Sequence, residues 1–288
     1  MVRRLALLLA VFFAAFANAQ ERISDLIYLK QGGSAFTLDV FKPAKPTGAA
    51  VIWLVSGGWV SDHGSINTGV AQLFNDKGIT LIQAVHGSQP KYTVPEIVMQ
   101  LKEAVRYLRT NAAKLGFDPD RIGVVGVSSG GHLSLMLGGT PVPGDPKAVN
   151  PIDKVGSEVQ AVVAFMPPTD FMNWGKSSFV AIEDKQLAPF LPALGVTPTT
   201  PKEKLQEVAK LLSPITYANA KFPPTLLVHG DADKLVPIQQ SQVMNEALGK
   251  AGVVHDFITI PKAGHDVGAV LPAVQRVLEW FTKHLAKK

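Results

Sequence analysis

The pattern Gly126-Val127-Ser128-Ser129-Gly130 matches the G-x-S-x-G turn that presents a nucleophilic serine in many hydrolases. The apolar stretch Ile122–Val127 predicts a strand before this turn, and Gly131–Leu137 predicts a helix after it, which is the context that the motif requires. The tight bend needs small residues two positions before and after the nucleophile. Ser128 has glycine at both positions, whereas Ser129 would place Val127 at one of them. We therefore expect Ser128 to be a nucleophile.

A histidine must accept the proton of such a serine, because a serine hydroxyl by itself is a weak nucleophile. In this type of turn the acid and then the histidine follow the serine in the chain, which leaves His255, His265 and His284. His255 begins a predicted strand, and His284 lies in the last amphipathic helix. His265 lies in a glycine-containing loop directly after the predicted strand Phe257–Ile260, at the same sheet edge as Ser128. We expect His265 to be the general base.

An acid must orient that histidine, and three aspartates follow predicted strands at the same edge. Asp231 lies in a tight Gly-Asp turn, where an aspartate side chain commonly bonds its own backbone. Asp233 lies two residues further out, from where its side chain can extend to a neighbouring loop. Asp170 follows the predicted strand Gln160–Met166. Asp233 is the favoured acid, and Asp170 and Asp231 are the alternatives.

Acyl transfer also needs hydrogen-bond donors for the oxyanion that develops in the transition state. One donor is expected to be the amide of Ser129, which follows the nucleophile. The other should come from the loop after the apolar run Ala49–Val55, and this loop begins Ser56-Gly57-Gly58-Trp59. Glycine allows the backbone to approach a substrate closely. The amides of Gly57 and Gly58 are therefore the predicted partners of Ser129.

The rest of the chain alternates between strand and helix patterns. Two short apolar stretches flank Gly32-Gly33 and predict a hairpin, and Thr93-Val94-Pro95-Glu96 is a capping box that opens a helix ending at Gly116. Strands separated by helices of this length form βαβ units. The predicted fold class is therefore α/β, with a mostly parallel central sheet and helices on both faces. The further predicted elements are Ile79–Val85, Ser129–Leu137, Thr225–Val228, Ile238–Leu248, Val254–Ile260 and Val267–His284.

The stretch at about 167–224 is longer than an ordinary crossover between two strands. It holds prolines, several aromatic residues and one capped helix from Thr200-Pro201 to Leu212. We expect a cap-like insertion that folds over the carboxyl ends of the strands, where open α/β sheets bind ligands. Trp174 and Phe179 from this insertion, together with Trp59, are the candidate substrate-binding residues, although aromatic side chains more often pack in a core.

Composition excludes several classes of protein. The chain has 288 residues, of which 47% are hydrophobic and 18% charged, so it is long enough for one substantial α/β domain. Its net charge is +5, or +3 without Arg3 and Arg4, and the charges are dispersed, so nucleic acid is not an expected partner. The chain has no cysteine and seven scattered histidines without an H-x-x-x-H pair. We expect neither a metal nor another cofactor.

The first residues have the pattern of an export signal. Positive charge near Met1 is followed by the apolar run Leu5–Phe16, and Ala17-Asn18-Ala19 is an A-x-A cleavage site. The apolar run is shorter than the ~20 residues that a membrane-spanning helix needs. We therefore expect a signal peptide at residues 1–19 and an exported mature domain at residues 20–288, periplasmic or secreted, without a membrane anchor.

Taken in order, these motifs resemble the α/β-hydrolase superfamily, and within it the exported carboxylesterases of the BD-FAE and hormone-sensitive-lipase-like groups. They are Ser56-Gly57-Gly58-Trp59, Gly126–His132, His229-Gly230-x-x-Asp233-x-x-Val236-Pro237 and Gly264-His265. The resemblance covers about Ile23 to Leu285. It implies Ser128 as nucleophile, Asp233 as acid, His265 as base and an oxyanion hole at Gly57, Gly58 and Ser129. Ser56 stands where the family commonly has histidine, but backbone donors do not depend on that side chain.

The expected function is a serine carboxylesterase that hydrolyses short-to-medium acyl esters of small-molecule or carbohydrate substrates through an acyl-enzyme. Acetyl or feruloyl esters of carbohydrates are one alternative. A prolyl-oligopeptidase-like peptidase is another, although such enzymes usually carry an N-terminal propeller. An inactive binding protein with this fold would be expected to lose Ser128, Asp233 or His265, and none is missing.

Overall fold

The computed structural model describes residues 21–175 and 185–287, without the side chain of residue 267. The predicted signal peptide and the candidate Phe179 lie outside the described residues. The strands are β1 (Glu21–Gln31), β2 (Ser34–Lys42), β3 (Ala50–Val55), β4 (Thr80–Val85), β5 (Ile122–Val127), β6 (Ala161–Phe165), β7 (Thr225–Gly230) and β8 (His255–Ile260). The α-helices are α1 (Thr68–Asn75), α2 (Val94–Leu115), α3 (Ser129–Gly139), α4 (Leu191–Leu194), α5 (Lys202–Leu212), α6 (Gln239–Lys250), α7 (Val267–Val270) and α8 (Val274–His284). Short 3₁₀ turns are η1 (His63–Ser65), η2 (Pro151–Lys154), η4 (Lys185–Phe190), η5 (Pro214–Tyr217) and η6 (Leu271–Ala273).

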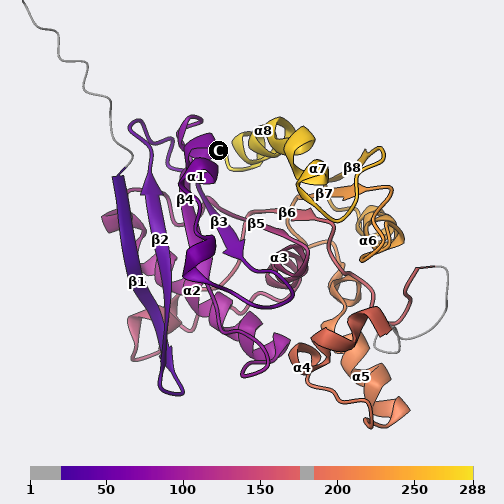
Figure 1. Ribbon diagram of the computed structural model, residues 1–288. Helices are drawn as coiled ribbons and strands as arrows, with labels where there is room; N and C mark the ends of the chain where they lie inside the picture. The colour runs from indigo at the N-terminus through magenta and orange to yellow at the C-terminus, as the bar shows by residue number, and fades with distance from the viewer. Residues whose placement is uncertain (1–20, 176–184, 288) are drawn as a thin grey trace, which may run out of the picture.

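In the described part of the chain, eight strands form one sheet in the order β1-β2-β4-β3-β5-β6-β7-β8 (Figure 1). The N-terminal hairpin of β1 and β2 is antiparallel, β2 pairs antiparallel with β4, and the remaining neighbours are parallel. The strand order reverses at β3, which lies between β4 and β5. The carboxyl ends of β3 and β5 therefore flank the crevice where open α/β sheets bind ligands.

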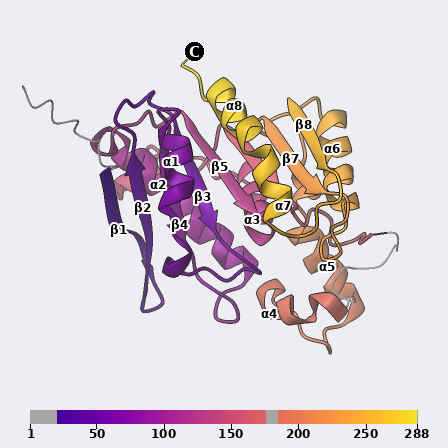
Figure 2. The same cartoon turned by 45° about the horizontal axis from the view of Figure 1, so that its top comes forward.

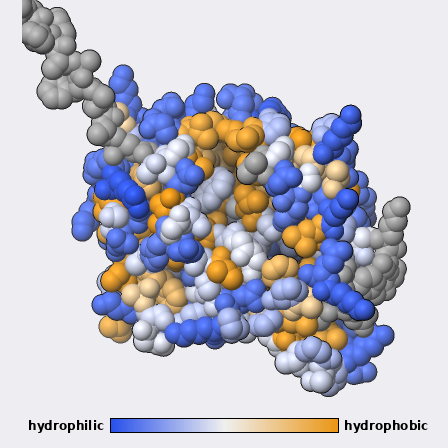
Figure 3. Space-filling model, in the orientation of Figure 1, coloured by the Kyte–Doolittle hydropathy of each residue, from blue (hydrophilic) through white to orange (hydrophobic). Residues whose placement is uncertain are grey.

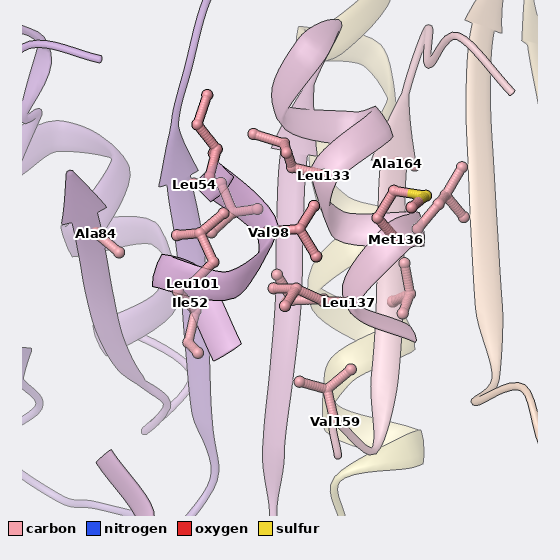
Figure 4. Close-up of a cluster of buried hydrophobic side chains, with 14 of the residues drawn as sticks. Ile52, Leu54, Ala84, Val98, Leu101, Leu133, Met136, Leu137, Val159 and Ala164 are labelled. Atoms are coloured by element: carbon pink, nitrogen blue, oxygen red, sulfur yellow. The ribbon is translucent and has the colours of Figure 1, made fainter. Parts of the chain in front are cut away.

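Helices cover both faces of the sheet, as the alternating pattern predicted (Figure 2). On one face α2, α3 and α6 pack against the strands, and Figure 4 shows side chains of α2 and α3 meeting those of β3 and β6. On the other face α1, α7 and α8 cover a second apolar cluster. The mostly parallel sheet with helices on both faces is the predicted fold class, which is confirmed. None of the helices within residues 21–175 and 185–287 is long and apolar enough to cross a membrane.

Helix α2 illustrates how local sequence signals set the limits of an element. The Thr93 backbone amide donates to the Glu96 carboxylate at 2.7 Å, and Pro95 lies in the first turn. Gly116 ends the helix in the left-handed conformation at φ 87°. The predicted apolar face, which includes Val98 and Leu101, is buried.

Two helical segments differ from the prediction. Helix α1 was not expected, because it has eight residues and buries only Ala71 and Phe74. Its clearest signal is Asn67, whose side chain accepts the amide of Val70 and caps the helix. The predicted continuous helix from 267 to 284 is divided into α7, η6 and α8, since Pro272 has no amide proton to continue the helical hydrogen bonding.

The long segment between β6 and β7 contains η4, α4, α5 and η5 rather than a single crossover helix. In Figure 1, α4 and α5 lie below the sheet, beyond the end of α3. Leu191, Leu194 and Leu212 are buried and join the main core, so these parts of the segment are packed against the domain.

Candidate active site

The turn between β5 and α3 has the strained geometry that presents a serine side chain. Ser128 has φ 55° and ψ −118°, in a region that L-residues seldom occupy. Its amide donates to the carbonyl of Phe165 at 2.8 Å, which ties the turn to β6. A Cβ atom on Gly126 would lie 2.3 Å from the backbone of Gly130, so the first glycine of the motif is required by close backbone contact.

The structure brings Ser128, His265 and Asp233 into one hydrogen-bonded chain. Ser128 Oγ lies 2.8 Å from His265 Nε2, and His265 Nδ1 lies 2.7 Å from Asp233 Oδ2. A carboxylate can only accept, so Nδ1 carries the proton and donates to Asp233. Nε2 is then the acceptor for the Ser128 hydroxyl. This tautomer allows the imidazole to remove the serine proton.

The carboxylate of Asp233 is fully buried, with an exposed side-chain fraction of 0%. Burial alone raises its pKa, but hydrogen bonds from His229 and His265 and the positive charge of protonated His265 outweigh this effect. The amides of Leu235 and Val236 also donate to Oδ1, at 2.9 and 3.0 Å. The pKa of Asp233 therefore lies well below its ordinary value, and the residue is ionised.

His229, at the end of β7, supports this aspartate and was not predicted to have a role. Its Nε2 lies 2.9 Å from the carbonyl oxygen of Val236 and 3.3 Å from Asp233 Oδ2, so this nitrogen carries the proton. Its Nδ1 lies 2.7 Å from Ser241 Oγ and accepts from that hydroxyl. His229 is buried and thus helps to hold the acid in place. The sequence signal that could have pointed to this role is the position of His229, four residues before Asp233.

The loop after β3 forms a two-residue turn in which both Gly58 (φ 57°) and Trp59 (φ 59°) have positive φ. The Gly57 amide donates to the Val60 carbonyl at 2.9 Å, and the Val60 amide donates back to Gly57 at 3.0 Å. The prediction that Gly57 donates to an oxyanion is therefore wrong for this arrangement, because the turn uses its amide. The amide of Gly58 donates to none of the described residues, and Gly58 and Ser129 line the same cavity as Ser128.

Two further side chains hold this turn. Gln89 was not among the predicted site residues. Its side-chain Nε2 donates to the Gly58 carbonyl at 2.6 Å, and its backbone amide donates to the Trp59 carbonyl at 3.1 Å. Ser56 Oγ lies 3.0 Å from Ser129 Oγ, which links the turn to the start of α3. Gln89 follows β4, 31 positions from Gly58, so no local pattern could have pointed to it.

A cavity of about 650 Å³ opens above Ser128. Leu187 and Phe190 of η4 line it, so the segment between β6 and β7 contributes to the cavity as predicted. Phe190 lies against the oxyanion turn, since a Cβ on Gly58 would come within 2.7 Å of its ring. Most of the other lining side chains are apolar; they include Trp53, Val70, Val127, Met166, Leu235, Val236, Val270 and Leu271.

The structure describes two of the three aromatic candidates, Trp59 and Trp174. Trp59 lines the cavity but is 3% exposed, and its Nε1 donates to His132 Nδ1 at 3.2 Å, so its ring is chiefly a packing element of the site. Trp174 stacks on Phe171 at 6.1 Å, buried in the core. Trp174 is not among the described residues that line the cavity. The prediction that Trp174 binds substrate is therefore wrong.

The two alternative acids accept backbone amides of loop residues. Asp170 accepts the amides of Met172 and Asn173 at 2.9 and 3.2 Å and stabilises its own loop. Asp231 accepts the amide of Lys262 at 2.6 Å and links two loops. Within the described residues, no group of three or more acidic or histidine side chains is arranged to hold a metal ion.

Comparison with known proteins identifies the family of this chain. Residues 38–248 match the family model described as BD-FAE, which is most of the chain. The chain belongs to the BD-FAE family. Among curated relatives, this BD-FAE family protein is 29% identical to esterase LipC of Mycobacterium tuberculosis over 238 residues, or 79% of this chain and 56% of LipC. It spans between a third and just over half of the length of the first curated relatives that it matches.

Two solved structures show the same architecture over nearly their whole length. A truncated carbohydrate esterase from gut microbiota is 26% identical, with a TM-score of 0.79 over 93% of this chain and 97% of the other. Esterase 2 of the planctomycete Thermogutta terrifontis with bound propionate is 25% identical, with a TM-score of 0.71 over 94% and 97%. The α/β-hydrolase fold is thus confirmed.

Proposed function

We propose that this BD-FAE family protein is a serine carboxylesterase that hydrolyses short-to-medium acyl esters through an acyl-enzyme. The observation that carries the proposal is the chain of hydrogen bonds from Ser128 through His265 to Asp233, with Ser128 and His265 lining a mostly apolar cavity. The esterase names of LipC and of the Thermogutta structure support the same reaction class.

In the acylation half of the reaction, Ser128 Oγ attacks the ester carbonyl carbon while His265 Nε2 takes the hydroxyl proton. The carbonyl oxygen becomes negatively charged, and the amides of Gly58 and Ser129 donate to it. One such donor is typically worth ~2.7–4 kcal/mol of barrier. When the intermediate collapses, the bond to the alcohol oxygen breaks and His265 returns the proton to that oxygen.

In the deacylation half, a water molecule takes the place of the alcohol. His265 accepts a proton from the water as its oxygen attacks the acyl carbon, and the same two amides stabilise the second oxyanion. Collapse of this intermediate breaks the bond to Ser128 Oγ, which regains the proton. The products are a carboxylic acid and an alcohol, so no cofactor is required for the balance of the reaction.

Acylated carbohydrates are a second candidate substrate class, favoured by the likeness to the gut carbohydrate esterase. Acetate release from acetylated xylan would support this candidate. Hydrolysis of simple alkyl esters without any release from xylan would exclude it. We also propose that the protein is exported, on the basis of the signal-like segment up to Ala19.

The test of the reaction is covalent labelling of the nucleophile. A fluorophosphonate should abolish the hydrolysis of 4-nitrophenyl butyrate and add one phosphonyl group, which fragment mass spectrometry should place on Ser128. Ser128→Ala should remove both the label and the activity. Ser134→Ala is the matched control, since Ser134 is buried one turn further along α3 and donates to Gly130. A label on Ser129, or activity that survives Ser128→Ala, would contradict the proposal.

A further inference from the structure

The cavity above Ser128 has an apolar extension along one face of the domain. A smaller cavity of about 80 Å³ lies between α1 and α7–α8 and shares four lining residues with the larger one, namely Trp53, Val70, Val270 and Leu271. We call the smaller cavity the α1–α7 groove. Its remaining lining residues are Leu73, Phe74, Phe165, Val274, Val277 and Leu278.

The walls and rim of this groove are apolar. Leu73 on α1 is 40% exposed and Leu271 on η6 is 67% exposed, and both line the smaller cavity. Figure 3 shows apolar surface gathered over α1 and α8 on this side of the molecule. Large apolar side chains that are exposed together beside a catalytic cavity mark a surface that a ligand covers.

Two polar residues that line the larger cavity, Asn67 and Asp266, each use one side-chain oxygen to accept a backbone amide at the start of a helix. Asn67 Oδ1 accepts the Val70 amide at 3.1 Å and caps α1. Asp266 Oδ1 accepts the Gly268 amide at 2.7 Å, at the start of α7. Neither residue lines the smaller cavity, whose lining residues are all hydrocarbon or aromatic side chains. The groove therefore offers apolar contact and no array of hydrogen bonds for a sugar.

The groove lies on the side of Ser128 to which a leaving group must go. His265 Nε2 has to return its proton to the alcohol oxygen, so the alcohol must lie next to His265. Helix α7, which begins two residues after His265, ends at Val270, and Leu271 begins η6 directly after it. His265, Val270 and Leu271 all line the same cavity as Ser128. The acyl part then lies towards Leu187 and Phe190, which line the same cavity but pack in the apolar cluster on the other face of the sheet.

We infer that the α1–α7 groove binds the alcohol portion of the ester, and that it favours longer linear aliphatic alcohols over short ones. This inference rests on the proposed esterase function and names its substrate class. Each methylene that enters an apolar groove should raise kcat/KM by about fourfold. Butyl acetate should therefore be hydrolysed with a kcat/KM about fifteenfold above that of ethyl acetate.

The experiment compares two ester series on the purified protein, with acid release followed by pH-stat titration. One series varies the alcohol, from ethyl to butyl acetate, and the other varies the acid, from ethyl acetate to ethyl butyrate. Leu73→Asp places a carboxylate at the rim of the groove, outside the residues that line the catalytic cavity. Leu211→Asp is the matched control, because Leu211 is 53% exposed on α5. Leu73→Met keeps the rim apolar.

The inference is supported if the butyl-to-ethyl acetate ratio is large in the wild type, Leu73→Met and Leu211→Asp, and falls at least fivefold in Leu73→Asp. Each ratio is taken within one variant, so a partial loss of folded protein cancels. A flat alcohol series overturns the inference, and so does a ratio that Leu73→Asp leaves unchanged. If kcat/KM rises only along the acid series, and Leu73→Asp abolishes that rise, the groove binds the acyl part instead and the inference is overturned. Failure to hydrolyse 4-nitrophenyl butyrate, or hydrolysis by Ser128→Ala, would instead refute the proposed function itself.

Discussion

Replacement of Asp233 by asparagine is the sharpest test of the proposed triad. In the native site Asp233 Oδ2 accepts from His265 Nδ1 at 2.7 Å, while Oδ1 accepts two backbone amides. An asparagine would keep its carbonyl oxygen on those amides, because they have no other acceptor there. Its NH₂ group would then face His265, where two donors cannot bond. The imidazole would shift its proton to Nε2 and lose its ability to accept the proton of Ser128.

The expected loss follows from this change of tautomer. In serine hydrolases whose acid is neutralised in this way, kcat falls by about 10³–10⁴, equivalent to about 4–5.5 kcal/mol of barrier. KM should change little, since Asp233 is fully buried and does not line the cavity. The assay is kcat with 4-nitrophenyl butyrate, with circular dichroism as a check that the variant is folded.

Asp170→Asn is the control for this experiment. Asp170 also follows a strand of the same sheet, but its carboxylate accepts from Met172 and Asn173 in its own loop. We expect its replacement to lower kcat by less than ~10-fold, because it acts only on local structure. Equal losses in the two variants, or a larger loss at Asp170, would refute the assignment of Asp233.

Four further predictions follow from the structure. Gln89→Ala should lower kcat by about 10-fold or more with little change in KM, because the oxyanion turn loses the bond to its Gly58 carbonyl; an unchanged kcat would show that the turn holds itself. Gly126→Ala should lower the unfolding free energy by about 3 kcal/mol in urea titration, since its Cβ would meet backbone at 2.3 Å. Burial lowers the pKa of both His86 and His132 from 6.5 to about 4, so between these values the unfolded chain binds protons that the folded chain does not. The free energy of unfolding should therefore be highest above pH 6.5 and fall towards pH 4, by about 2 kcal/mol per histidine at pH 5 relative to pH 7. Urea titrations at pH 5 and pH 7 measure this difference, and equal stability at the two pH values would contradict the prediction. Activity should persist in excess EDTA, and its loss with recovery on adding zinc or calcium would contradict a metal-free mechanism.

Elements with strong local signals could be predicted from sequence, including their limits. The capping box at Thr93 and the glycine at 116 delimit α2, and the apolar runs of β3 and β5 occur where the pattern placed them. These signals succeed because capping, periodicity and burial on one face are properties of a short stretch of chain. Helix α1 was missed since its pattern covers only two turns.

The candidate nucleophile and base could also be proposed from sequence. The glycines around Ser128 report a backbone bend that few other residues allow, and His265 follows a strand within a few residues. The sequence left three candidates for the acid, Asp170, Asp231 and Asp233. The choice among them depends on which loop stands next to His265, and that depends on the pairing of β7 with β8.

By itself, then, the sequence of this protein determined the alternation of strands and helices, the bend at Ser128 and the loops that carry polar residues to one sheet edge. Only the tertiary structure decided which polar groups meet there. It assigned the Gly57 amide to Val60, brought Gln89 to the carbonyl of Gly58 and buried Trp174 in the core. The physical reason is that local conformation depends on neighbours in the chain, whereas these contacts join loops that the strand order brings together from distant positions.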